Sequence, residues 1–262
     1  VKVLPASLLN VPEQLAFSTG TILVGEPDIP RPRPLHVTPA VDMTPSDLGV
    51  LNGCFQYFRW TRILGQAEPG RQSSGDTAQM KLGSIAHKFL ETATRPGAAA
   101  LADAGVADLA AVFDCHDWRS LNAASPEREL PFIMHLDIDG NECWVRGRMD
   151  AAVGGEIPRV IDYKYALWHE GAEAAYEAQM TAYALALMKA LGTDRAISEL
   201  WYLKAPIKII RREYTRDQAE MKLKDLFSRY LAALESNEWP RTERAHCDSI
   251  RCGFRQTCWG GN

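Results

Sequence analysis

The sequence lacks the features that would place a protein in a membrane or outside a cell. It contains no run of about 18 apolar residues, the length that a membrane-spanning helix requires. Its first residues lack the succession of charged, apolar and small residues that marks a secretory signal. Six cysteines are few for a disulfide-rich secreted scaffold of 262 residues. We therefore expect no membrane span and a cytoplasmic, intracellular location.

A positive net charge is also absent. The formal net charge is -4, so no positive field surrounds the whole protein to attract nucleic acid. Binding to nucleic acid would need a local basic patch, and residues 204–216 are a candidate because Glu213 is their sole acidic residue. The basic residues of this run are Lys204, Lys208, Arg211, Arg212 and Arg216. A solvated strand edge explains the run equally well.

The composition, 46% hydrophobic and 24% charged, is ordinary for a globular protein, and the length allows a substantial core. Residues 1–43 differ because prolines alternate there with Arg31 and Arg33, a pattern that favours extended polyproline geometry. We expect an arm or linker at 1–43 and one domain at 44–262. The chain starts without Met, which favours a piece of a longer polypeptide over a trimmed chain.

Hydrophobic periodicity predicts a mixed α/β fold, with a central sheet flanked by helices. Thr44 is a predicted helix N-cap, and Gly192 is predicted to follow a long helix as a C-terminal cap. Asp139-Gly140-Asn141 has the composition of a hairpin turn. The predicted helices span 44–60, 77–94, 173–191 and 215–234, with short helices in 95–125. The predicted strands comprise three between 129 and 165, then 197–203 and 207–214.

Residues 144–164 hold the most informative pattern. If 144–153 and 159–165 form a hairpin around Gly154 to Pro158, Asp150 lies opposite Asp162, with Cβ atoms about 5 Å apart. Alternation along the strand places Lys164 on the same face as Asp162. Two acids and an amine on one face can bind a divalent cation and orient a water molecule. A surface hairpin with solvated charges is the alternative.

Other polar residues in helical spacing accompany this hairpin. Gly83 and His87 lie one helical turn apart, and glycine weakens a helix by about 1 kcal/mol, which suggests a close approach to another group. Met80, Ile85, Phe89 and Leu90 are the expected apolar contacts of that helix. Gln179 and Tyr183 share a face of a later helix. A partly buried, hydrogen-bonded histidine is the alternative for His87.

Together, Gly83-x-x-x-His87, Glu129, Gly147-Arg148-Met149-Asp150, Asp162-Tyr163-Lys164 and Gln179-x-x-x-Tyr183 resemble the motifs of the PD-(D/E)XK nuclease superfamily, and within it the RecB-like family. The resemblance covers about residues 44–262, with the core at about 77–235. Met149 stands where the superfamily name has proline. The resemblance implies a restriction-endonuclease-like core that cleaves DNA.

The same resemblance implies roles for individual residues. His87, Asp150, Asp162 and the main-chain carbonyl of Tyr163 would bind Mg²⁺ or Mn²⁺, and Lys164 would position the attacking water. Gln179 and Tyr183 would contact the DNA backbone or support Lys164. Glu129, placed ahead of its strand, would belong to the catalytic group.

The cysteines form a second constellation. Cys247-x4-Cys252-x5-Cys258 near the end, with Cys54 far upstream, supplies four soft ligands. This set resembles the iron-sulphur staple of AddB-type and CRISPR-associated RecB-like nucleases, although four residues instead of two separate the first clustered pair. The resemblance implies a 4Fe-4S cluster that joins about 44–66 to 240–262. Structural Zn²⁺, with His246 as a further ligand, and free buried thiols are the alternatives.

The resemblance implies an exonuclease that acts on single-stranded or unwound DNA ends in repair and recombination. The proline-rich beginning fits the nuclease module of a helicase-nuclease, with a helicase domain or subunit as partner. The alternatives are a free-standing protein, a CRISPR-adaptation-type nuclease and an inactive DNA-binding or scaffolding module of the same fold. An iron-sulphur redox protein is disfavoured because it leaves the Asp-Lys hairpin unexplained. Cys115 and Cys143 are expected to be ordinary small apolar residues.

Overall fold

The computed structural model describes residues 22–24, 41–70, 78–92 and 94–260. The strands are β1 (Ile22–Val24), β2 (Val41–Met43), β3 (Glu127–Ile138), β4 (Asn141–Val153), β5 (Arg159–Lys164), β6 (Arg195–Tyr202) and β7 (Lys208–Thr215). The α-helices are α1 (Pro45–Gly53), α2 (Phe55–Phe58), α3 (Ala78–Leu90), α4 (Ala98–Asp103), α5 (Leu109–Asp114), α6 (His116–Ala123), α7 (Glu177–Leu191), α8 (Arg216–Ser236), α9 (Arg244–Ser249) and α10 (Arg255–Trp259). A π-helix, η3 (Arg59–Ile63), follows α2, and a 3-10 helix, η4 (Ala172–Tyr176), precedes α7.

The described strands form one mixed sheet in the order β1-β3-β4-β5-β6-β7, with β2 beside β4. The long strand β4 pairs with β2 near its beginning and with β5 near its end. β3 and β4 are antiparallel, whereas β5 and β6 are parallel and joined through α7. The predicted class, a mixed sheet flanked by helices, is confirmed.

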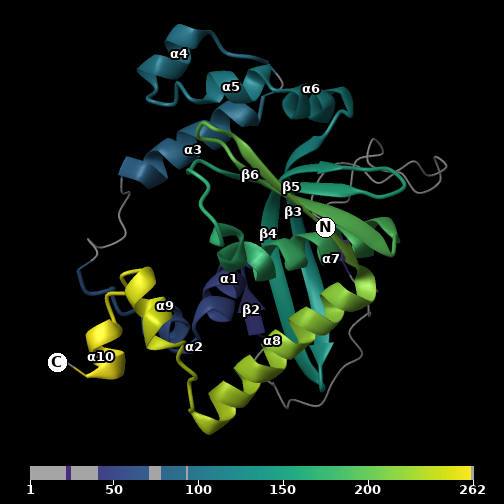
Figure 1. Cartoon of the computed structure of the whole chain (residues 1–262). Helices are drawn as coiled ribbons and strands as arrows, with labels where there is room; N and C mark the ends of the chain where they lie inside the picture. Colours follow the sequence, from purple (N-terminus) through teal and green to yellow (C-terminus); the bar gives the residue numbers. More distant parts are fainter. Residues whose placement is uncertain (1–21, 25–40, 71–77, 93, 261–262) are drawn as a thin grey trace.

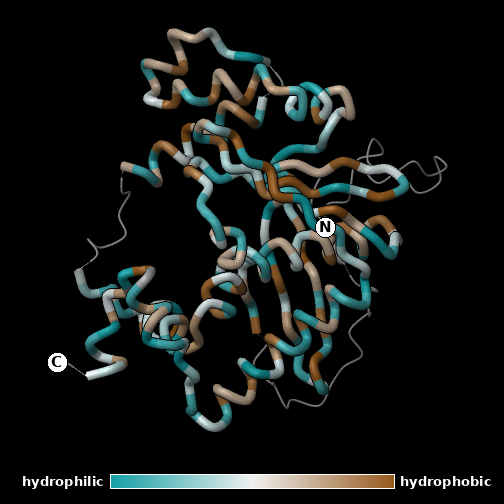
Figure 2. The backbone as a smooth tube through the Cα atoms, in the orientation of Figure 1, coloured by the Kyte–Doolittle hydropathy of each residue, from teal (hydrophilic) through white to brown (hydrophobic). Residues whose placement is uncertain are grey.

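Two apolar clusters cover the two faces of this sheet. Helices α1, α7 and α8 pack on one face, and α3 to α6 pack on the other (Figure 1). Hydrophobic residues recur along the central strands, while hydrophilic residues are frequent along α8 (Figure 2). Leu90, Leu101 and Leu121 of the second cluster are fully buried, and each contributes about 1.5–3 kcal/mol relative to an exposed position. Both helical layers therefore hold the sheet in place.

Local chemistry explains several boundaries. Thr44 and Thr215 each form a capping box at the start of a helix, with Asp47 and Gln218 as partners. Gly192 ends α7 in the left-handed conformation, as predicted. Asp139 and Gly140 both have positive φ, the geometry of the tight turn predicted between β3 and β4.

Three expectations are corrected. The helix predicted over 44–60 is broken at Cys54, whose extended backbone ends α1 and caps α2. Met80 does not pack in the core, because it is 54% exposed. Glu129 lies within β3, not ahead of it.

The proline-rich segment contributes two short strands to the sheet. β1 pairs with β3, and β2 pairs with β4 and buries Val41 and Met43 in the core. Apart from 22–24 and 41–43, residues 1–43 lie outside the described part of the chain. The division at residue 43 therefore stays a prediction.

Candidate active site

The hairpin of β4 and β5 has the predicted register. Its pairs are Ala151 with Ile161, Ala152 with Val160 and Val153 with Arg159, so the next step of this ladder would place Asp150 opposite Asp162. The ladder stops before that step. Instead, the Asp150 Oδ2 atom accepts a 2.6 Å hydrogen bond from the Tyr163 backbone N–H.

The other side of Asp150 is interrupted as well. β3 and β4 pair on both sides of Glu129, but Glu129 itself is skipped, and its φ is 50°. A non-glycine residue in this region costs on the order of 1–3 kcal/mol and persists only where the surroundings impose it. The irregular backbone turns Glu129 toward Asp150, and an ion pair of 3.1 Å with Arg148 also orients Glu129.

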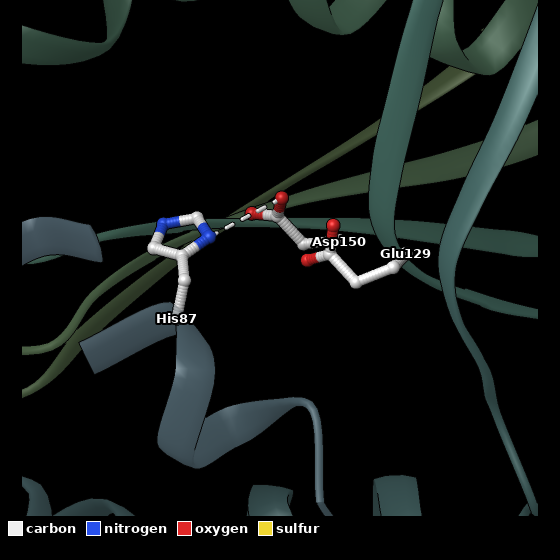
Figure 3. A group of neighbouring side chains, drawn as sticks. All are labelled: His87, Glu129 and Asp150. Carbon is white, nitrogen blue, oxygen red and sulfur yellow. Dashed lines mark ion pairs between the residues drawn. The ribbon is translucent and has the colours of Figure 1, made fainter. Parts of the chain in front are cut away.

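His87 reaches this point from α3. Its Nε2 atom donates to the Tyr163 carbonyl oxygen at 2.9 Å, and its Nδ1 atom lies 3.4 Å from Asp150 Oδ1. Figure 3 shows the imidazole facing the Asp150 carboxylate, with Glu129 beside it. The expected closeness of Gly83 to another group is not found, since a Cβ there would meet nothing within 4 Å among the described residues.

His87, Glu129 and Asp150 each offer a ligand atom, and these atoms lie within 4.8 Å of one another. In the part of the chain that the structure describes, no other three residues of the types His, Cys, Asp and Glu have ligand atoms this close together. One imidazole nitrogen and carboxylate oxygens suit Mg²⁺ or Mn²⁺. The third residue of this candidate metal-binding group is thus Glu129, whereas the sequence predicted Asp162 in that place.

Asp162 belongs to an adjoining network. Its Oδ2 atom lies 2.8 Å from Lys164 Nζ, and its Oδ1 atom accepts a 2.9 Å hydrogen bond from Gln179 Nε2. Gln179 also donates to the Tyr183 hydroxyl at 3.2 Å. All four predicted residues therefore meet, with α7 supplying the two that lie far from the hairpin in sequence.

The sequence did not identify Tyr176. Lys164 Nζ lies 4.6 Å from the centre of the Tyr176 ring, a cation–π contact that adds to its ion pair with Asp162. Tyr176 is the last residue of η4, a turn that the sequence pattern merged into the following helix. A tyrosine inside a predicted helix gave no signal for this contact.

Among the glycines of the motifs, Gly147 occupies a position that has no room for a side chain. A Cβ at Gly147 would lie 2.8 Å from Pro45 Cγ and 3.0 Å from Phe132 Cε1. Because Pro45 begins α1, Gly147 allows that helix to approach β4.

Burial and charge set the protonation of the cluster. Burial lowers the pKa of His87, but its hydrogen bond and charge interaction with Asp150 outweigh burial and raise the pKa to about 9. Burial, together with repulsion from Asp150, raises the pKa of Asp162 to about 6 although Lys164 opposes the shift. The pKa of Lys164 is raised because Asp162 outweighs burial. Without a metal, protons on His87 and Lys164 balance the carboxylates near neutral pH.

The four cysteines lie in a separate region, where the C-terminal segment packs on α2. The Phe254 ring contacts Tyr57 and Trp60, with ring centres 5.7 and 4.5 Å apart. Glu68 accepts a 2.8 Å hydrogen bond from the Gly253 backbone. These contacts bring the two cysteine-bearing segments together (Figure 1).

The thiols influence one another electrostatically. Burial and then the neighbouring Cys54, Cys247 and Cys252 raise the pKa of Cys258 to about 11. Among the described residues, no three of these sulphurs lie within 4.8 Å of one another. A tetrahedral zinc site, with Zn–S of about 2.3 Å, requires sulphurs about 3.8 Å apart.

A family model described as the PD-(D/E)XK nuclease superfamily matches residues 122–259. The crystal structure of SSO0001 matches with a TM-score of 0.49 and 18% identity, over 86% of this chain and 89% of that chain. A candidate exonuclease from Eubacterium rectale matches with a TM-score of 0.43 and 15% identity, over 80% and 86% of the two chains. LHK-Exo in complex with dAMP matches with a TM-score of 0.37 and 14% identity, over 74% and 88%. No curated protein matches the chain.

Proposed function

This chain belongs to the PD-(D/E)XK nuclease superfamily, and we propose that it is a Mg²⁺- or Mn²⁺-dependent deoxyribonuclease that acts as an exonuclease on single-stranded or unwound DNA ends. The observation that carries the proposal is the meeting of His87, Glu129 and Asp150 beside the ion pair of Asp162 and Lys164. A role in repair or recombination, with a helicase domain or subunit as partner, rests on the RecB-like order of the motifs.

The ligand set fits a hard divalent cation. His87, Glu129 and Asp150 would hold it, with Asp162 and the Tyr163 carbonyl as further oxygen donors. When bound, the cation neutralises charge at the scissile phosphate and lowers the pKa of water. In the structure the Tyr163 carbonyl bonds to His87 Nε2, which leaves Nδ1 facing the acids.

Lys164 acts best as a positive hydrogen-bond donor. Its pKa is raised by Asp162, so the metal-free site favours the protonated amine over a general base. The contacts with Asp162 and the Tyr176 ring restrict the amine, which then donates to the attacking water or to a phosphate oxygen.

Gln179 and Tyr183 hold Asp162 in place. They are only 5% and 6% exposed, so burial favours support of the Asp162–Lys164 pair over direct contact with the DNA backbone. The amide of Gln179 bridges Asp162 and Tyr183 and fixes the orientation of the carboxylate.

We further propose that Cys54, Cys247, Cys252 and Cys258 bind a 4Fe-4S cluster, with Zn²⁺ as the alternative. No three of these sulphurs lie within 4.8 Å of one another among the described residues, which supports a cluster, because a cluster places iron and sulphide between the thiolates. The cluster would join the segment around α2 to α9 and α10 and act structurally.

The nuclease assignment is tested with 5′- and 3′-labelled single- and double-stranded DNA in Mg²⁺, Mn²⁺ or EDTA. We expect cleavage that EDTA abolishes and that Lys164→Ala reduces by about 100-fold or more. The matched control is Lys224→Ala, which removes an exposed lysine of α8. Cleavage by Lys164→Ala at the control rate would refute the assignment.

The cluster assignment is tested by metal analysis of anaerobically purified protein. A 4Fe-4S cluster gives a brown protein with absorbance at about 400 nm and equal amounts of iron and acid-labile sulphide. A content of one zinc ion per chain without sulphide would contradict the cluster and support structural zinc instead.

A further inference from the structure

A loop of residues 165–171 connects the strand that ends at Lys164 with η4. The beginning of this loop is fixed by its neighbours. Gln79 of α3 donates to the Tyr165 carbonyl at 2.6 Å, and the Lys204 backbone N–H donates to the Ala166 carbonyl at 3.3 Å. The loop is therefore held at the edge of the candidate active site.

The loop exposes large apolar side chains. Leu167 is 59% exposed and Trp168 is 37% exposed. Burial of a large apolar side chain would stabilise the fold by about 1.5–3 kcal/mol. An exposed tryptophan four residues after a candidate catalytic lysine is more informative than a scattered apolar residue, because tryptophan is a preferred surface for base stacking.

The basic run that the sequence singled out divides into two groups. Arg211, Arg212 and Arg216 form ion pairs with acidic side chains of two helices and of the loop before β6. Lys204 and Lys208 instead lie over aromatic rings, with Nζ 4.9 Å from the Tyr165 ring centre and 5.1 Å from the Trp168 ring centre. Neither lysine has an ion pair with a carboxylate among the described residues.

The sheet register connects Lys208 to the site, whereas Lys204 is connected through its backbone bond to the loop. Lys164 pairs with Tyr202, and Tyr202 pairs with Lys208, so the three lie in one row across β5, β6 and β7. Paired residues share a face of the sheet, and strands lie about 4.8 Å apart, which places the Lys208 backbone about 10 Å from that of Lys164. This distance spans about three nucleotides at the 3.4 Å spacing of B-DNA, and fewer in an extended strand.

We propose that Trp168, Lys204 and Lys208 form a platform that binds the unpaired nucleotides next to the scissile phosphate. Trp168 stacks on a base, and the lysines contact phosphates. The proposal rests on the nuclease function above and names the residues that would give it a preference for single strands, because a base inside a duplex cannot offer its face to Trp168. The two lysines form a local positive patch that is complementary to the DNA backbone, although the net charge of the chain is -4.

Equilibrium binding tests the platform separately from catalysis. Fluorescence anisotropy of labelled (dT)20 is measured in EDTA, and the same preparations are assayed for cleavage in Mn²⁺. We expect Trp168→Ala to weaken (dT)20 binding by about 10-fold and Trp168→Phe to restore most of it, with blunt duplex binding unchanged. Melting temperatures of the variants confirm that the fold is retained.

The lysines are tested by the salt dependence of binding. The double variant Lys204→Ala, Lys208→Ala should lower the slope of log K against log salt by about 1.4, at about 0.7 per phosphate contact with a single strand. Lys224→Ala is the matched control and should leave the slope unchanged, since Lys224 is an exposed lysine of α8.

Three results would overturn the platform. These are unchanged (dT)20 binding by Trp168→Ala, an equal loss on blunt duplex, and a double-variant slope equal to that of the control. If DNA is still cleaved in Mn²⁺, such a result removes the platform alone and the nuclease assignment stands. Absence of both (dT)20 binding and cleavage in the unsubstituted protein would refute both proposals.

Discussion

The two candidate metal centres of this protein are built in opposite ways. The acidic centre lies on the long strands β3 and β4, on β5 and on α3, where most donor atoms already have partners. The thiol centre lies on α9, α10 and the break between α1 and α2, where the elements are short. Short helices are marginal without tertiary support.

This difference separates a preorganised centre from one that depends on its metal. At the acidic centre, protons on His87 and Lys164 replace the charge of the cation, so the metal-free geometry is stable near neutral pH. At the thiol centre, burial raises the pKa of Cys258 and keeps it a neutral thiol. Metal binding there should supply folding free energy, whereas at the hairpin it should supply activity.

The largest expected effect is the loss of cleavage in Asp150→Asn. The substitution removes a negative ligand while keeping the size of the side chain, so we expect DNA cleavage in Mg²⁺ to fall by about 100- to 1,000-fold. Iron content should stay unchanged. Single-turnover cleavage with metal analysis of the same sample measures both, and loss of iron together with activity would contradict the separation of the two centres.

Cys54→Ser should give the reverse pattern. Loss of one ligand should release the proposed cluster and lower the melting temperature by about 5 °C or more, with new protease cleavage within 240–262. Cys115→Ser is a matched control, since Cys115 also caps a helix with its Sγ atom. Equal iron and equal melting temperatures in the two variants would remove Cys54 from the ligand set.

Stability of the metal-free protein should depend on pH through His87. Its folded-state pKa of about 9 lies above the usual histidine pKa of 6.5, so its contribution is fully present below pH 6.5 and is lost as the pH rises through 9. We expect the melting temperature in EDTA to fall across this range and the fall to be smaller in His87→Gln. An equal fall in His87→Gln would assign the pH dependence to other groups.

The smallest effect is expected for Tyr183→Phe. This change removes the hydroxyl that accepts from Gln179 but leaves the Gln179–Asp162 bond. We expect a decrease in kcat of only a few-fold, because one neutral hydrogen bond contributes about 0.5–1.5 kcal/mol. A decrease as large as that of Asp150→Asn would instead give the Tyr183 hydroxyl a direct part in the reaction.

Local chemistry made much of the fold predictable. The caps at Thr44 and Thr215, the Asp139-Gly140 turn and the hairpin register follow from interactions within a few residues. The meeting of His87 with Asp150 required the resemblance to a family, because α3 and β4 are brought together by packing between distant segments.

The remaining features depend on long-range contacts that no local pattern encodes. Glu129 takes a left-handed backbone inside a strand, against its own preference. Strands β1 and β2 add to the sheet from a segment whose prolines indicate extended linker geometry. Gly147 matters because Pro45, from a different element, packs against it.

The central claim is that the hairpin, not the thiols, binds the cation used for cleavage. Isothermal titration with Mn²⁺ tests this claim directly on the unsubstituted protein, Asp150→Asn and Cys54→Ser. We expect Mn²⁺ affinity to fall by about 10-fold or more in Asp150→Asn and to be retained in Cys54→Ser. Unchanged affinity in Asp150→Asn, or loss only in Cys54→Ser, would contradict the account.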